Sequence, residues 1–122
     1  MVADDDVGAL EQMGSALEDA GFRVVSAADG RTALQEALTR RVDLIVMDVS
    51  ISHLSGVETC HCLKAMPKTQ KIPVILTAAK KDPATKALAE RTQGSVRVLR
   101  KPFTDESLVS VVQQLTRPKS LI

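Results

Sequence analysis

The chain has 122 residues, of which 44% are hydrophobic and 25% charged, and its 16 basic and 15 acidic side chains give a formal net charge of +1. This size and composition are typical of one globular domain with a buried core. The balanced charge argues against attraction to nucleic acid or to a membrane through net charge, so a charge-based function must be local. Without a membrane-length apolar run or a secretion signal in the sequence, we expect a cytoplasmic protein.

Hydrophobic periodicity predicts alternating strands and helices along the whole chain. In chain order, we predict a strand over 1–3, a helix over 7–20, a strand over 22–27, a helix that begins at Asp29, a strand over 42–49, a helix from Val57 that stops before Pro67, a strand over 73–76, a helix capped by Asp82, a strand over 96–99, and a helix capped by Thr104 and ended by Pro118. This alternation predicts an α/β fold, a doubly wound open sheet of five parallel strands with five helices.

Polar side chains stand where four of these strands end. Asp4, Asp5 and Asp6 follow the first strand, Asp48 closes the third, Thr77 closes the fourth and Lys101 follows the fifth. The intervals from Asp48 to Thr77 and from Thr77 to Lys101 are close to those of successive strand, helix and strand repeats of about 30 residues. Ligands of such sheets bind at the carboxyl ends of the strands, so we expect these side chains to converge on one edge.

Carboxylates, a hydroxyl and an ammonium at one edge predict a site for a divalent cation and a phosphoryl group. A carboxylate nucleophile such as Asp48 must overcome the repulsion of a phosphoryl donor. Asp4 and Asp5 can hold Mg²⁺, which prefers hard oxygen ligands. Lys101 can then bind one phosphoryl oxygen through a charge-assisted hydrogen bond, and the Thr77 hydroxyl can donate to another.

Taken one at a time, these residues also allow structural roles. An aspartate after a strand is commonly a helix cap, and this alternative stays open for residues 4–6. Thr77 could be a turn residue and Lys101 a solvated side chain. Asp48 fits a cap poorly, because seven residues separate it from Gly56.

Two cysteines, Cys60 and Cys62, lie two residues apart in a predicted helix and therefore point to nearly opposite sides, which excludes a disulfide between them. With His61 between them and His53 nearby, a zinc site is conceivable, but one helix cannot turn three consecutive side chains toward one ion. We expect reduced thiols, with Cys60 as a small core residue. His53 is expected to be a solvated loop residue rather than a phosphotransfer histidine.

The motifs together resemble the receiver domain of two-component response regulators. The matching segments are Val-Ala-Asp-Asp-Asp at 2–6, Asp48 at the end of the third strand, Leu-Thr-Ala at 76–78 and Lys-Pro-Phe at 101–103. The resemblance covers essentially the whole chain and implies a flavodoxin-like strand order of 2-1-3-4-5. It implies a receiver domain over 1–116, with 117–122 as a C-terminal tail or the start of a linker.

The resemblance also implies roles for individual residues. Asp48 would accept a phosphoryl group from a sensor histidine kinase, a phosphotransfer protein or a small donor such as acetyl phosphate. Mg²⁺ would be held by Asp5 directly, by Asp4 mainly through water, by Asp48 and by the backbone carbonyl of Ser50. Thr77 and Lys101 would bind the phosphoryl oxygens, and Pro102 would follow a cis peptide bond. We expect a regulatory phosphoacceptor with only slow autodephosphorylation, not a turnover enzyme.

Some positions depart from the family pattern. Ser52 replaces a usual proline, Ser55 replaces an acidic or amide residue, and Val98 replaces an aromatic residue that swings inward on activation. A switch would then depend on the fourth helix and the loop before it. The face of the fourth helix, fifth strand and fifth helix includes the basic residues Lys86, Arg91, Arg97 and Arg100. We expect it to dock an output domain or partner, without direct contact to nucleic acid.

Two other functions remain as alternatives. A phosphatase of the haloacid dehalogenase type also uses a strand-end aspartate with Mg²⁺, a hydroxyl and a lysine, but normally has a second aspartate two residues after the nucleophile. Ser50 stands at that position here. A degenerate receiver that serves as a constitutive docking module would not need Asp5, Asp48, Thr77 and Lys101 together.

Overall fold

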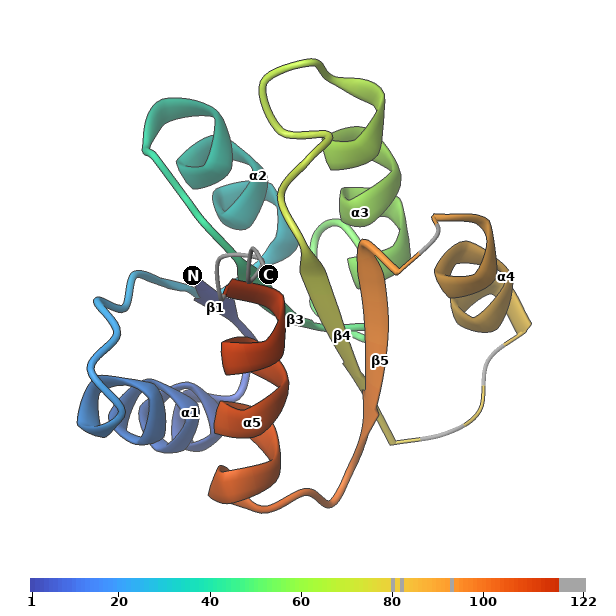
Figure 1. Cartoon of the computed structure of the whole chain (residues 1–122). Coiled ribbons are helices and arrows are strands. Elements are labelled where there is room, and N and C mark those ends of the chain that lie inside the picture. The colour runs from blue at the N-terminus through green and yellow to red at the C-terminus, as the bar shows by residue number, and fades with distance from the viewer. Residues whose placement is uncertain (80, 82, 93, 117–122) are drawn as a thin grey trace, which may run out of the picture.

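The computed structural model describes residues 1–79, 81, 83–92 and 94–116. Strands and helices alternate along these residues (Figure 1). In chain order they are β1 (Val2–Ala3), α1 (Val7–Asp19), β2 (Ser26–Ala27), α2 (Gly30–Thr39), β3 (Ile45–Asp48), α3 (Gly56–Ala65), β4 (Val74–Ala78), α4 (Pro83–Arg91), β5 (Val96–Arg100) and α5 (Asp105–Thr116). The predicted alternation is therefore confirmed.

The strands form one parallel sheet in the order β2-β1-β3-β4-β5. Parallel neighbours must be joined by crossovers, and a helix supplies each one here. The chain winds outward in one direction from β1 to β2 and in the other from β3 to β5, so the order reverses between β1 and β3. This confirms the predicted doubly wound sheet and places the reversal beside the strand end that carries Asp48.

Helices cover both faces of the sheet (Figure 1). One core cluster joins α1 and α5 to one face, and includes Met13, Leu17, Val46, Ile75 and Leu108. The other joins α2, α3 and α4 to the opposite face, and includes Ala33, Cys60, Ile45, Leu76 and Leu88. Because successive strand residues point to opposite faces, β3 and β4 supply both clusters, and every residue of these two strands is buried.

The predicted boundaries of the last four strands were wrong, those of the second and third by several residues. The strand predicted over 22–27 is reduced to Ser26–Ala27, because β2 is an edge strand and its partner β1 is only two residues long. The predicted strand over 42–49 is shortened to Ile45–Asp48. The fourth and fifth strands are longer than expected, so Thr77 lies inside β4 and is followed by Ala78.

The expected helix caps are confirmed where the structure describes them. Asp29 accepts a hydrogen bond from the Thr32 amide at 2.7 Å, and Thr104 accepts one from the Ser107 amide at 3.0 Å. The cap expected at Asp82, the stop at Pro118 and the tail at 117–122 lie outside the described residues. In the described part of the chain, none of the helices has the length and apolar character that crossing a membrane requires.

Candidate functional site

Strand register brings the predicted site residues to one edge of the sheet. Asp48 lies opposite Thr77 in the pairing of β3 with β4. Ala3 lies opposite Met47, so Asp4 leaves β1 beside Asp48. Ala78 lies opposite Arg100, and Lys101 follows at the end of β5. The adjacent strands β1, β3, β4 and β5 thus each contribute one of these side chains to the same edge, as the sequence predicted.

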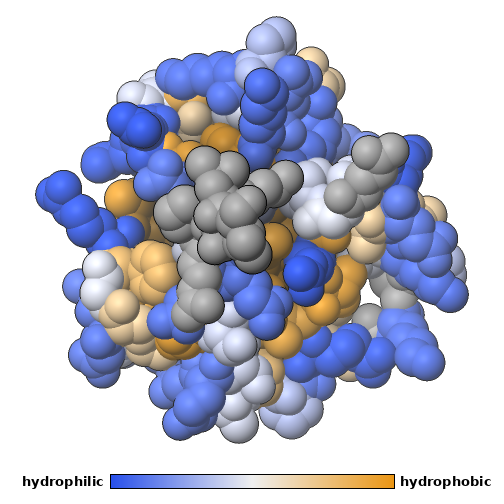
Figure 2. Space-filling model, in the orientation of Figure 1, coloured by the Kyte–Doolittle hydropathy of each residue, from blue (hydrophilic) through white to orange (hydrophobic). Residues whose placement is uncertain are grey.

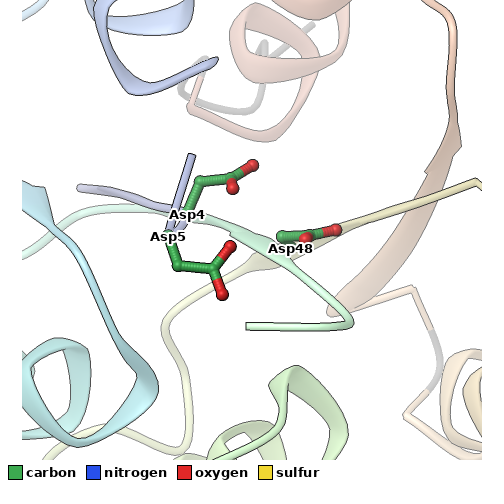
Figure 3. Close-up of side chains that lie close together, drawn as sticks. All are labelled: Asp4, Asp5 and Asp48. Atoms are coloured by element: carbon green, nitrogen blue, oxygen red, sulfur yellow. The ribbon is translucent and has the colours of Figure 1, made fainter. Parts of the chain in front are cut away.

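Three carboxylates gather there into an acidic cluster of Asp4, Asp5 and Asp48 (Figure 3). One oxygen from each lies within 4.8 Å of the others. Asp4 and Asp48 are buried, with 1% and 8% of their surface exposed, whereas Asp5 is exposed. In the part of the chain that the structure describes, no other group of three such side chains comes together, and this includes the two cysteines and the two histidines.

Asp6, the third residue of the acidic run, has a different role. Its side chain accepts a hydrogen bond from the Gly8 amide at 2.9 Å and caps α1. The alternative of a helix cap, open for residues 4–6 on sequence alone, is therefore correct for Asp6. Asp4 and Asp5 face the sheet edge instead, so neighbouring identical residues divide between structure and site.

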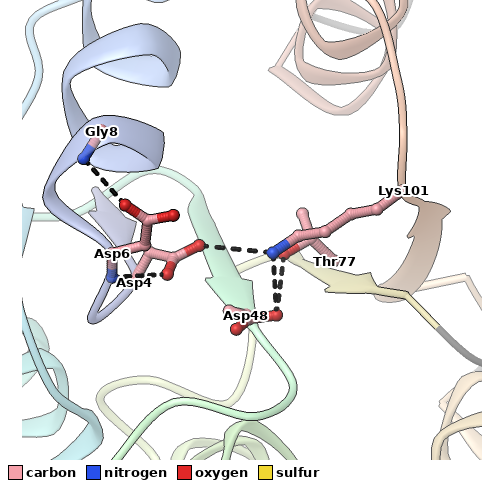
Figure 4. A network of polar contacts seen from close by, with 6 residues as sticks. All are labelled: Asp4, Asp6, Gly8, Asp48, Thr77 and Lys101. Atoms are coloured by element: carbon pink, nitrogen blue, oxygen red, sulfur yellow. Dashed lines mark hydrogen bonds and ion pairs between the residues drawn. The ribbon is translucent and has the colours of Figure 1, made fainter.

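Asp4 is the most constrained member of the cluster. Its Oδ1 accepts a hydrogen bond from the Asp6 amide at 3.0 Å (Figure 4). Its Oδ2 is buried without a hydrogen-bond partner among the described residues, and Lys101 Nζ lies 3.6 Å away. Burial raises the pKa of Asp4 above its ordinary value, and the neighbouring Asp48 and Asp5 add to this, while the Asp6 amide and Lys101 lower it.

A buried carboxylate oxygen without a partner is rare in proteins, because desolvation without a hydrogen bond is costly. Here that oxygen belongs to one of three carboxylates, which together offer a set of hard oxygen ligands. This donor set fits Mg²⁺, which binds carboxylate oxygens and keeps several waters. The residues present therefore fit the predicted cation.

Lys101 and Thr77 both approach the same oxygen of Asp48 (Figure 4). Lys101 Nζ lies 3.3 Å from Asp48 Oδ1, and Thr77 Oγ1 lies 3.5 Å from it, at the outer limit of a hydrogen bond. Thr77 is fully buried and Lys101 is about one-third exposed. The Lys101–Pro102 peptide bond is cis, as the resemblance implied. The ammonium thus lies between Asp4 and Asp48, where it can meet a bound anion.

The loop from β3 to α3 follows Asp48 directly. Ser50, whose carbonyl was expected to bind the metal, lies exposed in this loop, and its ligand role stays a prediction. Ile51 is buried, with 3% exposed, and the Gly30 amide donates to the Ser52 carbonyl at 3.0 Å. The loop is therefore anchored although Ser52 replaces the usual proline.

Sequence reasoning missed a positioning role for glycine. A Cβ on Gly56 would lie 2.6 Å from the carbonyl oxygen of Asp48, and a Cβ on Gly30 would lie 1.9 Å from that of Leu54. Only glycine permits such a close approach of two backbones. The sequence places Gly56 just before the helix predicted from Val57, but it does not reveal which backbone comes near this glycine.

Comparison with known proteins agrees with this geometry. The family model of the response regulator receiver domain matches residues 1–113. The chain is 32% identical over 117 residues to the probable transcriptional regulatory protein TcrX of Mycobacterium tuberculosis, covering 96% of this chain and 49% of that protein. It is 32% identical over 119 residues to PhoP of Bacillus subtilis, an alkaline phosphatase synthesis transcriptional regulatory protein, covering 96% and 48%. The chain thus spans about half the length of these curated relatives.

Solved structures show the same fold. The chemotaxis response regulator CheY4 of Vibrio cholerae has a TM-score of 0.83 and 28% identity, with 93% of this chain and 94% of that one covered. The receiver domain of the Francisella response regulator 1452 has a TM-score of 0.83 and 30% sequence identity, and the match covers 94% of this chain and 93% of that one. These matches do not favour the phosphatase or the constitutive docking module. The chain belongs to the response regulator receiver domain family, the phosphoacceptor modules of two-component signalling.

Proposed function

We propose that this receiver domain is phosphorylated on Asp48 and that the modification changes the surface it offers to a partner. One observation carries the proposal. Asp48 Oδ1 lies 3.3 Å from Lys101 Nζ and 3.5 Å from Thr77 Oγ1, beside the carboxylates of Asp4 and Asp5. A nucleophile, a cation, a hydroxyl donor and a set of metal ligands therefore share one edge of the sheet.

The reaction is a transfer of one phosphoryl group. A carboxylate oxygen of Asp48 forms a bond to phosphorus while the bond from phosphorus to the donor breaks, and the donor leaves with the electron pair of that bond. With a phosphohistidine donor the leaving group is the imidazole, and with acetyl phosphate it is acetate. Lys101 binds one oxygen of the transferred group, and the Thr77 hydroxyl donates a hydrogen bond to another.

Asp5, Asp48 and the Ser50 carbonyl, with Asp4 mainly through water, would hold Mg²⁺, and the ion would supply positive charge to offset the acidic cluster and the phosphoryl oxygens. Lys101 alone gives one positive charge against three carboxylates. The acidic cluster would repel a phosphoryl donor without further cationic charge, so we expect phosphorylation to require a divalent cation.

The same proposal covers the partners and the extent of the domain. A sensor histidine kinase or a phosphotransfer protein would supply the phosphoryl group, and an output domain or partner would bind at α4, β5 and α5. Residues 1–116 would form the receiver, and 117–122 would form a tail or begin a linker. Ser50 lacks the acid and base function of a second aspartate, so we expect slow autodephosphorylation and no rapid phosphatase turnover.

The test is to incubate the protein with Mg²⁺ and either acetyl phosphate or beryllofluoride and to measure intact mass and the change in its NMR spectrum. We expect one phosphoryl group per chain, no labelling of Asp48→Asn and none after chelation of the metal. Asp6→Asn is the matched control, because it also removes an acidic residue from the same run while keeping a good helix cap. It should label like the parent chain.

The other outcomes separate the alternatives. Continuous phosphate release at many turnovers per chain would favour a phosphatase and contradict the proposal. A folded protein that takes up neither reagent would favour a constitutive docking module. Equal labelling of Asp48→Asn and the parent chain would show that another residue is the acceptor.

A further inference from the structure

The loop from β3 to α3 packs against the amino end of α2. The first amides of a helix have no acceptor within the helix, and the Gly30 amide, the first of α2, donates a hydrogen bond to the Ser52 carbonyl at 3.0 Å. The Leu54 carbonyl also approaches this residue, because a Cβ on Gly30 would lie 1.9 Å from its oxygen. Two carbonyls of the loop therefore converge on one glycine of α2.

The same stretch of the loop is bound to the first turn of α3. Thr59 is fully buried, and its hydroxyl donates a hydrogen bond to the Leu54 carbonyl at 3.3 Å. A Cβ on Gly30 would lie 2.8 Å from Thr59 Oγ1 as well. The Leu54 carbonyl thus lies between α2 and α3, where a larger residue at position 30 would displace it.

His53, between the two carbonyls, has an unusual backbone conformation. Its φ of 69° lies in the left-handed region, which residues with a side chain seldom adopt. Such a conformation persists only where the surrounding structure holds it. The contacts of Ser52 with Gly30 and of Leu54 with Thr59 lie on either side of His53 and supply that support. The shape of the loop therefore depends on α2 and α3.

The first half of the loop belongs to the proposed phosphorylation site. The Ile51 amide donates a hydrogen bond to the Asp48 carbonyl at 3.3 Å, which closes a turn over residues 48–51 with Ser50 in its third position. Ser52 follows this turn directly. A shift of the Ser52 carbonyl therefore moves the end of the turn that contains Ser50.

The body of α2 is firmly held. The helix lies beside α3 on one face of the sheet (Figure 1), and Ala37 of α2 is buried in the same core cluster as Cys60 and Leu63 of α3. Figure 2 shows mainly hydrophilic surface over the part of the molecule where Figure 1 places these two helices, so their apolar side chains face inward. The amino end of α2 is thereby fixed relative to the strand that carries Asp48.

From these contacts, we infer that Gly30 is a positioning residue of the phosphorylation site. The amino end of α2 holds the second half of the loop so that the Ser50 carbonyl can bind Mg²⁺, and Thr59 assists from α3. The inference rests on the proposed function, in which Ser50 and the acidic cluster hold the ion, and it adds residues that act through the loop rather than as ligands. Mg²⁺ demands near-ideal ligand geometry, so a displaced carbonyl lowers its affinity.

The test is a titration with Mg²⁺ alone, followed by amide NMR shifts at a temperature at which each variant is folded. In Gly30→Ala the new Cβ must push the Leu54 carbonyl away, and we expect the dissociation constant for Mg²⁺ to rise at least about tenfold. With a chelator present, the amide shifts of residues 49–51 should already differ from those of the parent chain. This second measurement detects the displaced loop without any metal.

Two controls separate positioning from stability. Ala37→Gly weakens α2 farther along the helix, away from the loop, and should change the Mg²⁺ affinity less than about twofold. Ser52→Ala removes an exposed side chain but keeps the carbonyl that accepts from Gly30, so its Mg²⁺ affinity should also stay within about twofold of the parent value.

A pair of variants at Thr59 decides the question even where Gly30→Ala does not fold. Thr59→Val keeps nearly the same shape but removes the donor to the Leu54 carbonyl, so we expect the Mg²⁺ affinity to fall about threefold. Thr59→Ser keeps the hydroxyl and loses a buried methyl group, so it should be less stable than the parent chain yet bind Mg²⁺ within about twofold of it. Affinity that follows the hydroxyl rather than the stability supports the inference.

The inference would be overturned by parental Mg²⁺ affinity in folded Gly30→Ala, by equal losses of affinity in Gly30→Ala and Ala37→Gly, or by equal losses in Thr59→Val and Thr59→Ser. A parent chain that binds no Mg²⁺ overturns both this inference and the proposed function. A parent chain that binds Mg²⁺ but reacts with neither acetyl phosphate nor beryllofluoride contradicts the proposed function alone, and the affinities of the variants still decide the inference.

Discussion

The interior of the central strands and the edge at which they end differ sharply in what they contribute to the molecule. Every residue of β3 and β4 is buried, and the apolar ones pack into clusters on both faces of the sheet. At the carboxyl edge, the same strands end in a cluster of three carboxylates around one ammonium, with a buried oxygen that lacks a hydrogen bond among the described residues. The interior stabilises the fold, and the edge holds charges that the fold alone does not satisfy.

We expect the largest change in the free energy of unfolding for a substitution in the interior. Ile75 is fully buried in the cluster between the sheet and helices α1 and α5. Ile75→Ala removes three buried carbons and leaves a cavity, so we expect the free energy of unfolding to fall by about 3 to 4 kcal/mol. Chemical denaturation measures this change, and the slope against denaturant should stay the same.

Val7→Ala is the matched control for that substitution. Val7 is also β-branched and apolar, but 66% of its surface is exposed to solvent. Its truncation should change the free energy of unfolding by less than about 0.5 kcal/mol. Similar losses in both variants would mean that burial in the central sheet does not dominate the stability.

We expect a smaller loss of unfolding free energy for a substitution beside the end of β3, where the buried strand reaches the site. In Gly56→Ala the new Cβ would lie 2.6 Å from the Asp48 carbonyl oxygen, so α3 and the end of β3 must move apart. We expect a loss of about 2 to 3 kcal/mol in unfolding free energy, together with weaker beryllofluoride binding, because the backbone of Asp48 itself is displaced. Unfolding and beryllofluoride titration measure the two effects separately.

Gly14→Ala provides the comparison within a helix. A Cβ there would have its nearest neighbour, Val24 Cγ1, at 3.7 Å, which is ordinary contact. Alanine is the better helix former, so this variant should gain roughly 0.5 to 1 kcal/mol. A loss in Gly14→Ala as large as that in Gly56→Ala would show that both glycines are merely packed tightly.

The positions of the site residues could be predicted from the sequence because each depends on a strand end, and apolar runs mark strand ends well. The sequence assigned Asp4 and Asp5 to the cation but left open which residue of 4–6 caps the helix, because three identical neighbours differ only in where the turn into α1 points each side chain. The true length of β2 depends on the length of its partner strand. The role of Gly56 depends on a tertiary contact that leaves no local pattern in the sequence.

At the edge itself we expect a smaller effect than in the interior, and a gain of stability instead of a loss. Burial and the neighbouring carboxylates raise the pKa of Asp4 in the folded state above its unfolded value. An acid with a raised pKa stabilises the fold below its unfolded pKa, and this contribution is lost as pH rises through its folded pKa. At neutral pH, without a divalent cation, the ionised Asp4 therefore destabilises the domain.

Asp4→Asn should consequently stabilise the metal-free domain at neutral pH by about 1 kcal/mol, the usual size of a single substitution. The gain should shrink as pH falls through the raised folded pKa of Asp4 and should be gone below the unfolded pKa of an aspartate, where Asp4 of the parent chain is protonated in both states. Urea denaturation at several pH values in the presence of a chelator measures this, with Asp6→Asn as the control that removes an exposed carboxylate. A loss of stability at neutral pH in Asp4→Asn would instead mean that the contact with Lys101 outweighs the cost of the buried charge. The edge would then contribute to the stability of the fold in the same way as the interior.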